Sequence, residues 1–171
     1  MPPQTNHSDD PNADTHTALA MPDLDQRPFT ARVERDLAAS PAQLYAAFTT
    51  QWERWFARPG SAAIEPSIGR PFFFETEHNL HRHPHYGRFL RLQPSRLVEL
   101  TWVTGSRGTD GAETILTVEF TPNGNGSKVR LTHAGFYNTA TAKQHEDAWR
   151  GPVLDELDRR FRPNNLQSEN K

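Results

Sequence analysis

The feature that most constrains the fold of this chain is an apolar stripe near its C-terminus. Between residues 139 and 161, large side chains recur every four residues at His145, Trp149, Val153, Leu157 and Phe161, with Leu154 beside them. That spacing places them on one face of an α-helix. A long helix with one apolar stripe needs a broad surface to cover. The stripe therefore predicts a helix that packs on a sheet.

The sequence before the helix supplies the strands of such a sheet. Runs of strand character lie at residues 28–37, 71–78, 86–92, 97–104, 114–121 and 128–136. The polar segments SRGTDG and PNGNGS separate the last of these runs and are typical of turns. We therefore expect an antiparallel meander.

Capping signals predict where the helices begin. Ser40, Pro41 and Gln43 combine an N-cap, a proline at the first helical position and a capping-box partner. The same pattern recurs at Thr50 with Glu53, which predicts a second short helix, and at Thr141 with Gln144, which predicts the start of the long helix at or just before Thr141.

A proline interrupts the long helix. Pro152 lacks a backbone N–H and clashes with the preceding turn, so we expect a kink or a break near Ala148.

Composition sets the limits of the domain. The first 26 residues hold five aspartates, no lysine and no arginine, so we expect residues 1–26 to be a disordered acidic leader, in which Met21 is an alternative start. Residues 27–162 are long enough for one domain with one core, and residues 163–171 are expected to form a flexible tail.

Charge and residue usage exclude several classes of function. Net charge is −2, and the leader's −5 leaves +3 for the remainder, too little for a nucleic-acid surface. The chain has no cysteine, no signal-peptide pattern and no apolar run that could span a membrane. These features indicate a cytoplasmic protein without disulfides or thiolate metal sites.

Several local signatures resemble one known family. They are Ser40-Pro41 at a helix start, YAAFTTQWERW, LVELTW, LTHAGF at residues 131–136 and HEDAWRGPVLDEL at residues 145–157. Together they are similar to the C-terminal domain of the activator of heat-shock protein 90 ATPase, which belongs to the START-like, helix-grip (SRPBCC) superfamily. The resemblance implies an α+β fold: a curved antiparallel sheet of six or seven strands around a long C-terminal helix, with two short helices after the first strand.

The resemblance also implies an apolar cavity between sheet and helix. We expect inward-facing side chains to line it, among which Trp102 and Trp149 are the foremost candidates. The candidate cavity residues are Phe74, Trp102, Leu116, Val118, Leu131, His133, Phe136, His145, Trp149 and Val153.

His133 and His145 have two possible roles. Both are expected to point into the space between sheet and helix, where a polar pair could orient a ligand or move a proton. The alternative is a structural histidine tied to a hydroxyl or a backbone group.

A run of histidines near Glu77 at first suggests a metal site. His78, His81, His83 and His85 lie within eight positions. We expect strand alternation and Pro84 to distribute them over both faces of a hairpin, which favours an exposed loop over a zinc site.

Three functional hypotheses follow. The first is a non-enzymatic module, monomer or homodimer, that binds a small, largely apolar molecule such as a lipid, an aromatic compound or a polyketide-like compound, without a cofactor or a metal. The second, implied by the family, is a regulator that acts by binding a chaperone or another protein. The third is a cyclase or hydrolase that uses His133 or His145 as acid or base; this needs a second activating group, and none is recognisable, so no catalytic residue is assigned.

Overall fold

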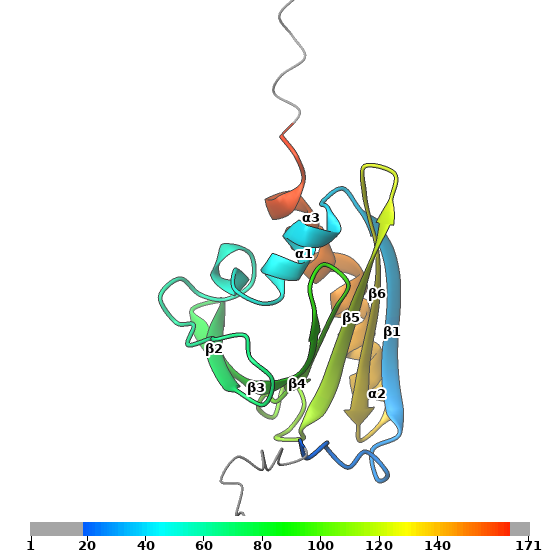
Figure 1. Ribbon diagram of the computed structural model, residues 1–171. Coiled ribbons are helices and arrows are strands. Elements are labelled where there is room, and N and C mark those ends of the chain that lie inside the picture. The colour runs from blue at the N-terminus through cyan, green and yellow to red at the C-terminus, as the bar shows by residue number, and fades with distance from the viewer. Residues whose placement is uncertain (1–18, 165–171) are drawn as a thin grey trace, which may run out of the picture.

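The computed structural model describes residues 19–164, which form one six-stranded antiparallel sheet and its covering helices (Figure 1). The sheet order is β1-β6-β5-β4-β3-β2, so β2 to β6 form a meander and β1 lies beside β6. The elements in chain order are β1 (Phe29–Leu37), α1 (Pro41–Ala47), η1 (Trp52–Arg54), β2 (Pro71–His78), β3 (His81–Gln93), β4 (Leu97–Trp102), β5 (Thr114–Asn123), β6 (Gly126–Phe136), α2 (Thr139–Ala148), η2 (Trp149–Val153) and α3 (Leu154–Phe161).

The sheet bends so that its two arms enclose the helices. Figure 1 shows β2 and β3 on one side, β1 and β6 on the other, and α1 and α3 between them. The helix α2 packs on β1 and β6, and α1 contacts β5. This arrangement confirms the predicted α+β, helix-grip architecture.

The C-terminal helix also protects an edge of the sheet. β1 is an edge strand, so its outward backbone groups lack a partner strand. The Glu146 carboxylate accepts the Arg32 backbone N–H at 3.1 Å, and Arg150 donates to the Arg32 carbonyl at 3.3 Å. Farther along, Asp158 accepts the backbone N–H of Ala38 at 2.9 Å. Charged residues of the helix therefore replace the missing strand.

The helix continues through Pro152 without breaking. Residues Trp149–Val153 form a π-helical segment, and the N–H of Leu154 bonds to the Trp149 carbonyl five residues back. In a regular α-helix the N–H of residue 152 would bond to the Ala148 carbonyl, but Pro152 has no N–H. The wider π turn therefore loses no hydrogen bond that an α-helix could form at this position. The irregularity predicted near Ala148 is thus a π segment that begins at Trp149.

The π segment also changes which side chains are buried. Trp149, Leu154, Leu157 and Phe161 are buried, with a spacing of five across the π segment and then three and four. Val153, which a regular stripe would bury, is only half-buried. One extra residue per turn explains this displacement.

Two of the three predicted capping boxes are wrong. Ser40 and Gln43 form theirs as expected. The second helix is a single 3₁₀ turn without a side-chain cap, because the Thr50 N–H is still bonded to the Ala46 carbonyl of the first helix. The long helix begins at Thr139 because the Asn138 side chain accepts the Thr141 N–H at 2.8 Å.

One strand is longer than its sequence pattern predicts. β3 begins at His81 rather than at residue 86, and a tight turn at Asn79 and Leu80, both with positive φ, joins it to β2. Its first residues pair with β2, while its pairing with β4 is limited to its second half and an isolated bridge from Tyr86 to Val103. Pro84 is tolerated within β3 because no β4 residue pairs with it, so its missing N–H costs no hydrogen bond to β4.

The core fills the space between the short helices and the sheet with aromatic rings. Trp52 of η1 contacts Phe74 of β2 and Trp102 of β4, and Phe48 and Trp55 pack on Trp52 and on each other. The Trp55 indole donates to the Ala47 carbonyl at 3.0 Å, whereas the buried Trp52 indole N–H has no partner within residues 19–164.

The segment before β1 is held against the sheet. Arg27 donates to the carbonyls of Glu113 and Gly135, and Leu24 lies beside Gly135. The predicted disordered leader and flexible tail fall mainly on residues 1–18 and 165–171, which lie outside the described residues. Within residues 19–164, no helix has the length and apolar character needed to cross a membrane.

Candidate functional site

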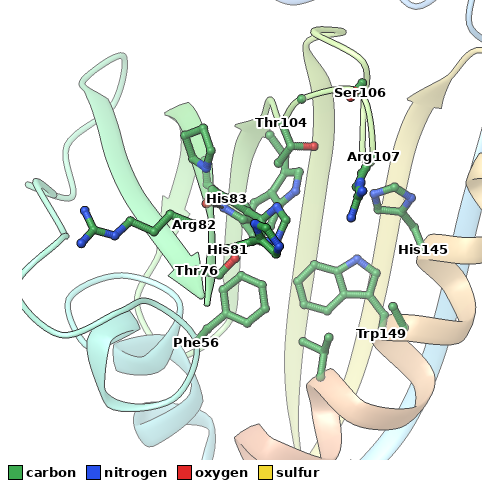
Figure 2. A pocket seen from close by; sticks show the side chains of 17 residues that line it. Phe56, Thr76, His81, Arg82, His83, Thr104, Ser106, Arg107, His145 and Trp149 are labelled. Carbon is green, nitrogen blue, oxygen red and sulfur yellow. Dashed lines mark hydrogen bonds between the residues drawn. The ribbon is translucent and has the colours of Figure 1, made fainter. Parts of the chain in front are cut away.

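A cavity of about 510 Å³ opens between the C-terminal helix, β3 and the connection between β4 and β5 (Figure 2). Its apolar wall is formed by Phe56, Trp102, Trp149 and Val153. The rings of Phe56 and Trp102 lie 5.8 Å apart, as do those of Trp102 and Trp149, so they form one continuous surface. A volume of this size is typical of small-molecule sites.

The polar wall of the cavity is basic. The polar and small residues that line it are Thr76, His81, Arg82, His83, Pro84, His85, Thr104, Gly105, Ser106, Arg107, Gly108, His145 and Ala148. None of the described lining residues is an aspartate or a glutamate. In Figure 2, Arg107 is directed into the cavity from its loop, whereas Arg82 points away from it.

Hydrogen bonds hold the Arg107 loop in place. Thr104 and Thr109 exchange backbone-to-hydroxyl hydrogen bonds of 2.9 and 2.8 Å, and the N–H of Gly111 bonds to the Thr104 carbonyl at 2.9 Å. The loop is therefore a closed turn between β4 and β5, and it also borders a second cavity of about 510 Å³ on the side of Phe136 and Tyr137.

His133 is a structural histidine that does not line the main cavity. It is 0% exposed, and both ring nitrogens are used. The Trp149 indole N–H donates to its Nδ1 at 3.2 Å, and its Nε2 lies 2.8 Å from the Thr114 hydroxyl, which itself donates to the Trp102 carbonyl at 2.5 Å. Nε2 therefore carries the proton and Nδ1 accepts.

This network holds His133 in the neutral form. A second proton on Nδ1 would face the Trp149 N–H, so two donors would oppose each other. Burial lowers the pKa of His133 well below its ordinary value, and the nearby His145 lowers it further. His133 thus has no free nitrogen for acid–base chemistry.

His85 has one nitrogen free. Its Nδ1 lies 2.9 Å from the His83 carbonyl, which has no proton to give, so Nδ1 must be the donor. The ring stacks on Phe74 at 4.9 Å and meets the Trp102 ring edge-on at the same distance. Burial lowers the pKa of His85 to about 4, so at neutral pH the ring is neutral and Nε2 is a hydrogen-bond acceptor.

His145 has the same arrangement on the opposite wall. Its Nδ1 donates to the Thr141 carbonyl at 2.9 Å, and burial lowers its pKa. Among the described residues, neither His85 nor His145 is hydrogen-bonded to a carboxylate or a hydroxyl group. The site therefore holds neutral imidazole acceptors and no activated pair.

The structure brings four of the candidate cavity residues together. Trp102, His145, Trp149 and Val153 line the main cavity. The remaining candidates are placed elsewhere: Phe136 borders the second cavity, and Phe74, Leu116, Val118, Leu131 and His133 are buried in packed surroundings. Aromatic rings from α1 and η1 cover the inward face of the sheet, so most of that face contacts protein.

Three histidines of β3 line the cavity and were not among the candidate cavity residues. Our expectation that strand alternation distributes them over both faces is wrong for His81, His83 and His85, because residues two apart share a face of a strand and β3 already begins at His81. The alternation H-x-H-x-H was the available signal. Within residues 19–164, no three His, Asp or Glu side chains converge closely enough to hold a metal ion.

Comparison with known proteins extends these observations. The family described as Activator of Hsp90 ATPase homolog 1-like protein matches residues 38–162. No curated protein matches the chain.

Solved structures share the fold at low sequence identity. A protein from Chromobacterium violaceum is 21% identical with a TM-score of 0.67, covering 80% of this chain and 100% of its own. The Aha1 dimer from Colwellia psychrerythraea is 18% identical with a TM-score of 0.59, covering 80% and 98%. An HSP90 activator from Plasmodium falciparum is 17% identical with a TM-score of 0.59, covering 75% and 93%.

Proposed function

Because the chain belongs to the Activator of Hsp90 ATPase homolog 1-like family, with its helix-grip fold, we propose that it is a non-enzymatic module that binds a small, largely apolar molecule. The observation that carries this proposal is the cavity of about 510 Å³ with its wall of Phe56, Trp102, Trp149 and Val153. A cytoplasmic location is part of the proposal.

Apolar burial would supply most of the affinity. Removing apolar surface from water contributes roughly 25 cal/mol per Å², so a ligand that covers the aromatic wall has a substantial driving force. The free nitrogens of His85 and His145 lie at the margin of that wall and would fix the orientation of the ligand.

A binding role is favoured over catalysis by the surroundings of the imidazoles. An acid or base needs a partner that activates it or a reacting group within reach. His133 is sealed by Trp149 and Thr114, and the Nδ1 atoms of His85 and His145 are tied to backbone carbonyls.

Native mass spectrometry of the protein purified from its own host tests the proposal, followed by a thermal-shift screen of lipids, aromatic compounds and polyketide-like compounds. We expect a co-purifying molecule, or a compound that raises the melting temperature in proportion to the logarithm of its concentration. A folded, empty protein that no compound stabilises would contradict the proposal.

A second candidate is regulation of a chaperone through protein binding. It is favoured by two relatives of the same fold, one named an HSP90 activator and one named Aha1. The test is the ATP turnover of the host's chaperone with and without the protein. Unchanged turnover at saturating protein would remove this candidate.

A further inference from the structure

We propose that the preferred ligand of the main cavity is an aromatic compound that carries both a hydroxyl group and a carboxylate. This proposal rests on the proposed binding function and specifies its ligand class. It follows from the combination of an aromatic wall, neutral imidazole acceptors and one inward-facing guanidinium around the same space (Figure 2).

The aromatic wall selects a flat apolar body. Phe56, Trp102 and Trp149 contact one another ring to ring, with the planes of Phe56 and Trp149 inclined by only 17°. A ligand ring therefore lies against this surface rather than between its members, and it would make stacked or edge-on contacts with it.

The imidazoles select a hydrogen-bond donor. The backbone carbonyls of His83 and Thr141 accept hydrogen bonds from Nδ1 of His85 and His145, so the ring protons lie on Nδ1. Each Nε2 therefore has a lone pair that can accept a hydrogen bond from a ligand. Within residues 19–164, the only side-chain nitrogen or oxygen that is both fully buried and without a partner is Trp52 Nε1. The Nε2 atoms of His85 and His145 are therefore not fully buried, and both residues line the cavity. A purely apolar ligand would displace water from these atoms without providing a replacement hydrogen-bond donor, which would weaken its binding.

A phenol-type hydroxyl matches one such acceptor. It donates one proton, it is planar with the ring that stacks on the aromatic wall, and it remains protonated near neutral pH. A carboxylate placed against the same nitrogens would offer only acceptors, so it belongs at another part of the cavity.

The guanidinium of Arg107 selects that carboxylate. Arg107 enters the cavity from the β4–β5 loop (Figure 2), and no acidic side chain of the described residues pairs with it or lines the cavity. A guanidinium donates two parallel hydrogen bonds to a carboxylate. The two recognition elements therefore specify a hydroxylated aromatic acid.

A matched set of compounds tests the proposal by titration calorimetry near neutral pH. The probes are 3-(4-hydroxyphenyl)propionate, 3-phenylpropionate without the hydroxyl, 4-propylphenol without the carboxylate, and propylbenzene without either. We expect the hydroxy acid to bind at least about tenfold more tightly than each compound that lacks one group, the factor typical of one well-formed hydrogen bond or ion pair.

Two variants assign each preference to its residue. Arg107→Gln should remove the advantage of the acid over 4-propylphenol and keep the hydroxyl preference. His145→Leu should reduce the advantage of the hydroxyl and keep the carboxylate preference. Arg96→Gln is the matched control, because Arg96 is an exposed arginine that is not among the lining residues of either cavity, and it should change neither preference. Circular dichroism confirms that each variant is folded.

The outcomes separate this proposal from the binding function on which it rests. If all probes bind with similar affinity, or propylbenzene binds best, the cavity is a general apolar site and the ligand class is wrong while the binding function stands. If the preferences survive both variants, Arg107 and His145 do not carry them and the proposal is overturned. If folded protein binds none of the probes, the binding function itself fails for ligands of this size.

Discussion

Single hydrogen bonds decide which ring nitrogen carries the proton in three histidines. Burial lowers the pKa of His133, His85 and His145 because it disfavours the charged ring. Their partners differ: His133 accepts from an indole N–H, whereas the other rings donate to backbone carbonyls. The same residue type therefore has a sealed structural role at one position and an open acceptor at the other two.

Stability should fall in mild acid because these rings are neutral in the folded protein. For His85 the pKa falls from 6.5 to about 4 on folding, so between these values the unfolded chain binds more protons. The free energy of unfolding is therefore highest above pH 6.5 and decreases as the pH falls towards 4.

The His85→Phe variant isolates one part of this acid sensitivity. Phenylalanine keeps the stack on Phe74 and does not titrate. Between about pH 8 and pH 5, the free energy of unfolding should decrease by about 2 kcal/mol less in the variant than in the parent. Urea denaturation at both pH values measures this, and parallel losses in parent and variant would contradict it.

Two buried tryptophans provide a matched pair of substitutions. Trp55 donates to the Ala47 carbonyl, whereas the Trp52 N–H has no partner. Replacement of either by phenylalanine removes the same atoms, but only Trp55→Phe loses a hydrogen bond. We expect Trp55→Phe to have a free energy of unfolding lower than that of Trp52→Phe by about 1 kcal/mol in urea denaturation. The reverse order would show that the Trp52 N–H makes an interaction that its distances do not reveal.

At the scale of elements, the π segment of the C-terminal helix sets the register of the core. The spacing of five from Trp149 to Leu154 brings Leu154, Leu157 and Phe161 onto the buried face, and it turns Val153 towards the cavity. Acidic residues of the same helix also join it to β1 and its end, because Asp155 pairs with Arg35 of β1 at 2.7 Å and Asp158 accepts the Ala38 N–H.

Changing the length of the π segment tests its role. Deletion of Pro152 shortens the spacing from Trp149 to Leu154 to that of a regular α-helix, so the buried face is kept and the free energy of unfolding should change by less than about 2 kcal/mol. Insertion of one alanine after Pro152 rotates three buried side chains away from the core, and should cost about 5 kcal/mol or more.

Thermal and urea unfolding of the two variants measures the difference between them. An insertion that is tolerated as well as the deletion would mean that the packing of the last helical turns does not depend on this register.

At the scale of the whole molecule, the cavity is the part of the core that is left unfilled. The aromatic rings of α1 and η1 occupy one side of the bent sheet, and the remaining space opens beside α2 and β3. Ala148 borders that space, and its small side chain leaves the cavity open.

Filling the cavity should separate stability from binding. Ala148→Phe places a ring in the space, so we expect a melting temperature equal to or higher than that of the parent and the loss of binding of aromatic ligands. Ala140→Phe makes the same substitution on the exposed face of α2 and should keep binding. Thermal shift with and without 3-(4-hydroxyphenyl)propionate measures both. Ligand binding that survives in Ala148→Phe would place the ligand elsewhere.

The signals for most elements are local, so the sequence was enough to predict them. Alternation along β1, β4, β5 and β6 and the high strand propensity of β2 predicted these strands, the Ser40 capping box predicted the start of α1, and the stripe from Trp149 to Phe161 predicted a helix on a sheet. Side-chain periods of two and 3.6 residues are properties of the backbone itself, so they are readable without a structure.

Which of these faces are filled and which remain open depends on how distant segments pack together. Burial of Leu116, Val118 and Leu131 was readable from their alternation, but their distance from the cavity depends on where the rings of α1 and η1 pack. The roles of His85 and His133 likewise follow from their hydrogen bonds. His85 bonds to the His83 carbonyl because β3 is already extended there, and His133 bonds to Thr114 and Trp149, which tertiary contacts bring beside it. A cavity is space that no side chain occupies, and unoccupied space is a property of the packing of distant segments, which no local pattern encodes.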